Sequence, residues 1–117
     1  MRNIILIIFL GLCFNIQAQK KELRKIDKLV TESFFKEANN ELQDSKSLIL
    51  SSEDKYKAQF YFYDSKVSNE LDEYENAINS LNELNQLNPN SNLPTKLQQE
   101  YSNLSLIIAN SVVNSAV

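Results

Sequence analysis

The chain has no histidine and no tryptophan, and its 117 residues include a single glycine and a single cysteine. Without histidine, a Ser-His-Asp triad, a Cys-His pair and a histidine-containing zinc site cannot form. A single cysteine excludes a disulfide framework within the chain. A single glycine excludes glycine-rich phosphate loops and disfavours the tight hairpin turns of β-sheets. These absences remove most catalytic equipment and favour an all-α protein.

Residues 1–18 have the three-part layout of a secretory signal peptide. A positive start at Arg2 is followed by an apolar run over 4–14, and a polar stretch ends on the small residue Ala18. The apolar run is too short for a bilayer-spanning helix, which needs about 20 residues. We therefore predict cleavage after Ala18, with Gln19 as the new N-terminus. The product is expected to be periplasmic or secreted, without a transmembrane span.

Cys13 leaves one alternative open, because a lipoprotein signal also ends in a cysteine that becomes acylated. Leu10 fits such a signal, but Leu12 stands where a small residue is needed. A conventional signal is therefore favoured over a lipid anchor through Cys13.

Removing the leader leaves residues 19–117, which contain no glycine, cysteine or histidine, and 11 basic against 15 acidic residues, a formal charge of −4. This mild acidity gives no electrostatic footprint for nucleic acid. We predict no enzymatic activity, no cofactor and no metal. Carboxylates cluster at 53–54 and at 72–75, where an acid–base pair or a weak cation site is the chemical alternative. Helix-start charges and solvated loops explain both clusters better.

Apolar residues recur at helical spacing in five segments, which predicts five amphipathic helices after the leader. The expected helices span about 20–30, 34–50, 55–71, 72–87 and 95–115. Thr31 or Ser33 is expected to cap the second helix, and residues 51–54 carry capping chemistry for the third. The four adjacent aromatics from Phe60 to Tyr63 would alone favour a strand. Helical spacing continues on both sides of them, so we predict a helix there.

Residues 58–91 resemble one tetratricopeptide repeat, a 34-residue unit of two helices. The segment 74–78, Tyr-Glu-Asn-Ala-Ile, matches the core of the second helix of that repeat. A small residue in the first helix and an alanine in the second let the helices approach closely. Asp64 and Ser68 depart from the pattern, which has an apolar and an aromatic residue there. The positions that carry the resemblance are Tyr61, Ser65, Tyr74, Ala77, Leu81, Leu84 and Pro89.

A weaker copy of the same core, Phe-Lys-Glu-Ala at 35–38, lies in the helical pair 20–50. The helix over 95–115 would be the first helix of a further repeat or a capping helix. More broadly, the chain resembles the N-terminal part of exported tetratricopeptide-repeat proteins of Bacteroidetes bacteria. Such arrays need about three repeats for stability, so the resemblance leaves open whether the chain is a fragment of a longer array.

The resemblance implies a solenoid of antiparallel helical hairpins that binds a protein or peptide in the bacterial envelope or outside the cell. In that family, the first helix of each repeat lines a concave surface. Carried onto this sequence, the lining residues are Gln59, Phe62, Lys66, Asn69 and Glu70, with Phe62 as the expected anchor. The alternative function is that of a structural exported helical bundle without a concave binding site.

Overall fold

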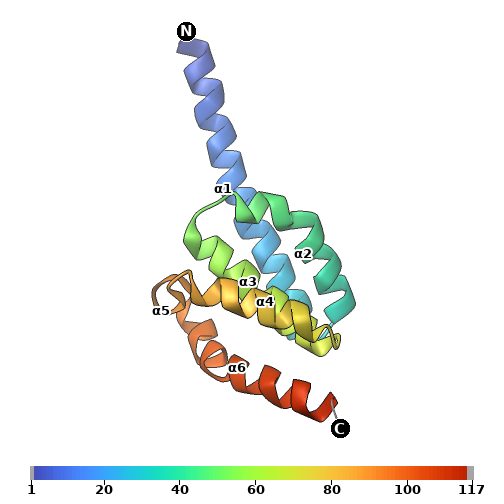
Figure 1. Ribbon diagram of the computed structural model, residues 1–117. Helices are drawn as coiled ribbons and strands as arrows, with labels where there is room; N and C mark the ends of the chain where they lie inside the picture. The colour runs from blue at the N-terminus through green and yellow to red at the C-terminus, as the bar shows by residue number, and fades with distance from the viewer. Residues whose placement is uncertain (1, 116–117) are drawn as a thin grey trace.

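The computed structural model describes residues 17–115 with their side chains and gives the backbone of the first helix from residue 2. The predicted signal peptide, residues 1–18, therefore lies almost wholly outside the residues described in full. The part of the chain described is all α, as predicted, and consecutive long helices pack as antiparallel neighbours (Figure 1). Its six helices are α1 (Arg2–Thr31), α2 (Phe35–Leu50), α3 (Asp54–Glu70), α4 (Tyr74–Asn85), α5 (Pro89–Asn92) and α6 (Thr95–Ser115).

The predicted limits of α2 and α3 are correct to within one residue, and the differences elsewhere have local causes. The fourth helix was expected to begin at Asp72 but begins at Tyr74, because Asp72 takes a left-handed conformation with φ of 63°. The same helix ends at Asn85, two residues before the predicted end at 87, and Asn88, with φ of 50°, turns the chain before α5. Pro89 then starts the single turn α5, where an irregular link was predicted, since proline suits the first position of a helix.

Three turns place Ser33, Asp72 or Asn88 in the left-handed region that glycine usually occupies. Because Ser33 reverses the chain, it cannot also cap α2. Phe34 holds that position without a side-chain cap, so the predicted capping by Thr31 or Ser33 is wrong. The serines of the next turn do not cap α3 either. Ser51 donates back to the carbonyl oxygen of Leu48 at 2.9 Å, which satisfies the end of α2 instead.

Replacing Ser33 with glycine is expected to raise the free energy of unfolding by about 0.5–1 kcal/mol, because the left-handed conformation costs about 1–2 kcal/mol for an L-residue with a Cβ. Ser47→Gly is the matched control within α2, where the same change is expected to lower that free energy by about 0.5–1 kcal/mol. Urea denaturation measures both variants. If glycine lowered the free energy of unfolding at both positions, or raised it at both, that would contradict the left-handed conformation of Ser33.

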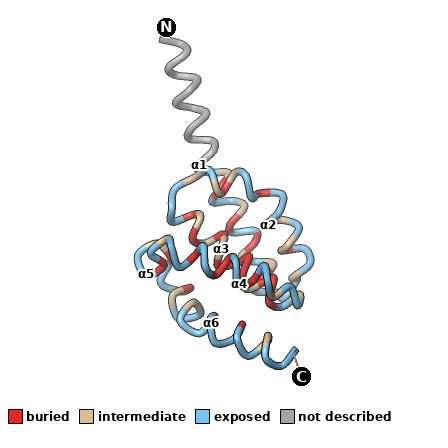
Figure 2. Tube along the Cα trace, in the orientation of Figure 1, coloured by how far each residue is buried: buried red, intermediate tan, exposed pale blue. Residues whose placement is uncertain are grey.

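The core lies between α1, α2, α3 and α4 and the inner side of α6, where Leu97, Leu104 and Ile108 are buried, and α3 is its centre. Helix α3 packs against α1, α2, α4, α5 and α6, so it is covered on most sides. Figure 2 shows the buried positions on the facing sides of these helices, whereas most of α6 is exposed. This enclosure explains how Phe60, Phe62 and Tyr63 are all buried on a single helix, and the predicted helix over the aromatic run is confirmed.

Helices α3 and α4 approach closely at two small, fully buried residues, Ser65 and Ala77. The hydroxyl of Ser65 donates across the interface to the carbonyl oxygen of Ala77 at 2.7 Å. A larger side chain at either position would separate the helices. The close approach expected from the sequence is therefore present at the two residues that predicted it.

A polar network replaces the apolar contact expected at Asp64. Oδ2 of the buried carboxylate accepts hydrogen bonds from the Ser80 hydroxyl at 2.5 Å and from the Asn76 amide at 3.1 Å, whereas its Oδ1 is buried without a partner among the described residues. The same amide donates to Ser68 at 2.6 Å. The two departures from the repeat pattern, Asp64 and Ser68, are thus joined to α4 through Asn76. The hydrogen bonds to Oδ2 offset part of the cost of taking this carboxylate out of water.

Candidate functional site

One face of α3 is bordered by α1 on one flank and by α6 on the other, and two clefts lie along it. The first, the α3–α6 cleft, has a volume of about 230 Å³. This is below the range of about 300–1,000 Å³ that small-molecule pockets occupy, so it suits a side chain or a length of peptide. Its lining residues are Phe62, Lys66, Asn69 and Glu70 from α3 and Glu100, Asn103, Leu104 and Ile107 from α6.

Four of the five residues predicted to line a concave surface meet in the α3–α6 cleft, and the fifth, Gln59, lies in the second cleft. Their exposure differs from the expectation at one position. Phe62 is 1 % exposed, so its ring packs in the core under the cleft and does not protrude as an anchor. Lys66 and Glu70 present their charged ends to solvent.

Two features of the α3–α6 cleft are polar. Lys66 forms an ion pair with Glu100 at 2.8 Å, which links α3 to α6 but is solvent-exposed enough to contribute little stability. Asn69 is 8 % exposed, and its Oδ1 is buried without a hydrogen-bond partner among the described residues. The resemblance to the tetratricopeptide repeat predicted that Asn69 lies on this face, but it did not predict that its Oδ1 is buried without a partner.

The second cleft, here named the basic cleft, has a volume of about 400 Å³. Lys20 and Arg24 reach it from α1, Lys55 from α3 and Lys96 from α6. The sequence did not predict it, because these cations lie on the polar sides of helices far apart in the chain. Its base includes Leu23, Tyr56 and Tyr63, which are all buried.

Asp27 joins three helices at the edge of the basic cleft. Its Oδ1 accepts a hydrogen bond from the Tyr63 hydroxyl of α3 at 2.7 Å, and its Oδ2 pairs with Lys96 of α6 at 3.0 Å. Burial raises the pKa of Tyr63 well above its ordinary value, and the hydrogen bond to Asp27 raises it further. Asp27 thereby links α1 to α3 and to the start of α6, and its pair with Lys96 is exposed enough to contribute little stability.

The raised pKa of Tyr63 predicts a loss of stability in alkali. The folded state favours the neutral form of Tyr63, and tyrosine ionises in the unfolded chain at about pH 10. The contribution of Tyr63 to the free energy of unfolding is therefore complete below about pH 10 and falls as the pH rises further. Tyr63→Phe is expected to be about 0.5–1.5 kcal/mol less stable at pH 7, because it loses the hydrogen bond to Asp27.

Above about pH 10 the gap between wild type and Tyr63→Phe is expected to shrink by up to about 1.4 kcal/mol per pH unit. Urea denaturation of both proteins at a series of pH values measures it. The pKa values of Tyr61 and Tyr101 are also raised by burial, but both residues are present in both proteins and cancel in the comparison. A constant gap from neutral to strongly alkaline pH would contradict the buried hydroxyl.

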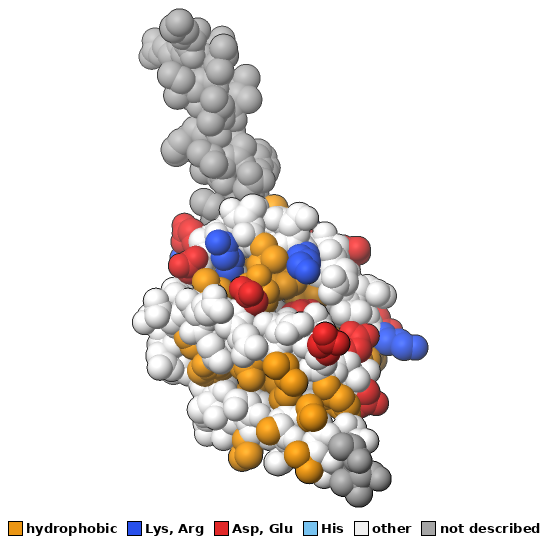
Figure 3. Space-filling model, in the orientation of Figure 1, with side chains coloured by type: hydrophobic (Ala, Val, Ile, Leu, Met, Phe, Trp, Pro, Cys, Tyr) orange, Lys and Arg blue, Asp and Glu red, His pale blue; other side chains and the backbone are white. Residues whose placement is uncertain are grey.

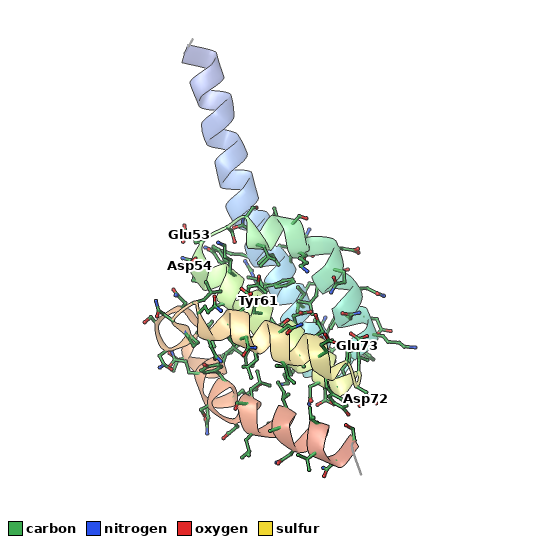
Figure 4. The ribbon with its side chains drawn as sticks, viewed as in Figure 1. Glu53, Asp54, Tyr61, Asp72 and Glu73 are labelled. Atoms are coloured by element: carbon green, nitrogen blue, oxygen red, sulfur yellow. The ribbon has the colours of Figure 1, made fainter. Side chains whose placement is uncertain are left out.

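The two carboxylate clusters lie at opposite ends of the α3 hairpin. Figure 4 shows Glu53 and Asp54 near the start of α3 and Asp72 and Glu73 near the turn into α4. All four side chains are exposed. Asp72 accepts a hydrogen bond from the Tyr74 hydroxyl at 2.8 Å, which raises the pKa of Tyr74. Among the described residues, no group of three or more His, Cys, Asp or Glu side chains could hold a metal ion.

The C-terminal helix leaves apolar surface uncovered. Leu106 and Val113 are 63 % and 62 % exposed on the outer side of α6, and Ile107 is also exposed. Figure 3 shows apolar side chains gathered along the region where α4 and α6 meet. Within the part of the chain described with side chains, no helix has the length and apolar content to cross a membrane.

The fold and clefts define an all-α protein of antiparallel helices with two clefts along its central helix. No protein-family model matches the chain, and neither a curated protein nor a solved structure matches it significantly.

Proposed function

We propose that this protein is a non-catalytic scaffold that binds an extended protein or peptide segment along the cleft-lining face of α3. Asn69 in the α3–α6 cleft carries the proposal. Its buried Oδ1 has no partner among the described residues, and such an unpaired group costs about 1–3 kcal/mol. Because Oδ1 is covered, a bound peptide would reach it only with a rotation of the Asn69 side chain toward the cleft, after which a backbone N–H of the peptide would be its donor.

The arrangement of helices supports a solenoid of the tetratricopeptide type. Each long helix contacts its neighbour in sequence, and α3 also contacts both α1 and α6. The close approach at Ser65 and Ala77 is the packing that the repeat requires of its two helices. In such a solenoid α1, α3 and α6 would be the first helices of successive hairpins, and they border the two clefts.

Selection of peptides from a random displayed library on the purified full chain tests the proposal. A selected peptide is expected to bind Asn69→Ala about tenfold more weakly than wild type. The variant cannot accept the hydrogen bond from the peptide N–H, and the loss of such a bond corresponds to about 1.4 kcal/mol. Asn79→Ala, which removes an exposed asparagine from α4, is the matched control and is expected to bind like wild type. Failure to enrich any peptide, or equal binding by both variants, would overturn the proposed cleft.

We also propose export, with cleavage after Ala18. The polypeptide recovered from the envelope or medium of a native host is expected to begin at Gln19, which mass spectrometry of the intact protein measures. A protein that retains residues 1–18 would contradict cleavage. A lipid mass on an N-terminal Cys13 would favour the anchored alternative instead.

A structural role in the envelope is the second candidate, and the uncovered apolar side of α6 favours it. Exposed apolar patches on otherwise polar proteins mark contact surfaces. A structural component would assemble without binding peptides in the α3–α6 cleft. Peptide selection therefore separates the two functions, because only the first requires Asn69.

A further inference from the structure

The basic cleft concentrates positive charge on a chain whose overall charge is negative. Four cationic side chains and one carboxylate line it, whereas the whole chain has 12 basic and 15 acidic residues. Gln17, Lys20, Lys21 and Arg24 line an adjoining hollow, which extends the positive surface along α1. Composition alone does not produce this local excess, since acidic residues outnumber basic ones overall.

The single carboxylate in the basic cleft is already paired. Asp27 accepts one hydrogen bond from Tyr63 and one contact from Lys96, which occupy its two oxygens. Neither Lys20 nor Arg24 pairs with a carboxylate among the described residues within 4.0 Å. Lys55 lies 3.7 Å from Glu53, but both side chains are more than half exposed, so this pair is weak.

The base of the cleft is apolar and aromatic while its rim is cationic. Leu23, Tyr56 and Tyr63 are buried beneath it, and the amine of Lys55 lies 5.1 Å from the centre of the Tyr56 ring. Apolar walls exclude water and strengthen the attraction of the rim for an anion. A ligand that matches both features carries carboxylates next to apolar side chains.

The geometry points to an acidic peptide segment as the ligand of the basic cleft, with Lys20 and Arg24 holding its carboxylates. Arg24 can bind a carboxylate through two parallel N–H donors, as a planar guanidinium does. A long polyanion fits less well, because the net negative charge of the rest of the chain would repel it. The inference rests on the proposed function, since Gln59 and Phe62 place both clefts along one face of α3.

Fluorescence anisotropy with the full chain tests this assignment. The probe is a labelled peptide of about eight residues in which Asp and Glu alternate with Leu, long enough to cross the cleft. The same peptide with Asn and Gln in place of the acids is the uncharged comparison. The acidic peptide is expected to bind, the amide peptide is not, and added salt is expected to weaken the binding.

The double variant Lys20→Glu, Arg24→Glu is expected to weaken binding of the acidic peptide about tenfold, because two attractions for the peptide carboxylates become repulsions. The matched control Lys36→Glu, Lys46→Glu makes the same change of charge on exposed α2 positions and is expected to retain wild-type affinity. Circular dichroism checks that both proteins stay folded. Equal loss in both would show unspecific attraction and overturn the inference.

Two further measurements identify the ligand and separate this inference from the proposed function. Inorganic polyphosphate or vesicles with anionic lipid that displace the acidic peptide at lower concentration would overturn the assignment to carboxylates. Acidic-peptide binding is expected to survive Asn69→Ala, since Asn69 lies in the other cleft. If library peptides bind through Asn69 but the acidic peptide does not bind, only the present inference fails. If neither binds, both fail.

Discussion

Replacing Phe60 with alanine is expected to lower the free energy of unfolding by about 3–5 kcal/mol. The ring is 1 % exposed at the centre of α3, the helix that every other described helix contacts. It also meets the ring of Tyr61 edge to face at 5.6 Å, a geometry that adds about 0.5–1.5 kcal/mol. Small domains are stable by about 5–15 kcal/mol, so this loss would remove a large fraction of the total stability.

Thermal and urea denaturation followed by circular dichroism measure the effect of Phe60→Ala. The melting temperature is expected to fall by about 4–8 °C for each kcal/mol lost. Phe34→Ala is the matched control, because Phe34 is 50 % exposed in the turn before α2. A loss below about 1 kcal/mol for Phe60→Ala, similar to that of the control, would contradict a core centred on α3.

Replacing Ala77 with leucine is expected to lower the free energy of unfolding by about 2–6 kcal/mol, an effect of the same order as that of Phe60→Ala. Overpacking a filled core costs about 1–3 kcal/mol. Moving α4 away from α3 would also break the 2.7 Å hydrogen bond that Ser65 donates to Ala77, and a buried hydroxyl without a partner costs about 1–3 kcal/mol. The change therefore acts on the contact that defines the α3–α4 hairpin.

Asn79→Leu provides the control for Ala77→Leu, since it adds the same side chain to an exposed position of the same helix. It is expected to leave the free energy of unfolding within about 0.5 kcal/mol of wild type. Ser65→Ala separates the two causes, because it removes the hydrogen bond without adding volume. Wild-type stability for Ala77→Leu would rule out a close approach of α3 and α4 at this residue.

The resemblance to the tetratricopeptide repeat predicted Lys66, Asn69 and Glu70 on one face of α3, and residues three and four apart do share a face of a helix. The resemblance could not show which residues lie opposite these three. Glu100 pairs with Lys66 from α6, 34 positions later in the chain, and that approach depends on how the hairpins stack. The burial of Phe62 has the same origin, because the packing of neighbouring helices decides which apolar residues of α3 remain exposed.

The scarcity of glycine, together with apolar residues at helical spacing, was enough to predict an all-α fold and four of the five long helical segments to within about two residues at most ends. The small residues Ser65 and Ala77 likewise identified the close α3–α4 contact, since only small side chains permit it. The basic cleft, by contrast, was decided by tertiary structure alone. Its cations come from α1, α3 and α6, and Asp27 pairs with Lys96 across 69 positions of sequence. Local pattern shows the polar side of each helix, but only packing determines which polar sides face one another.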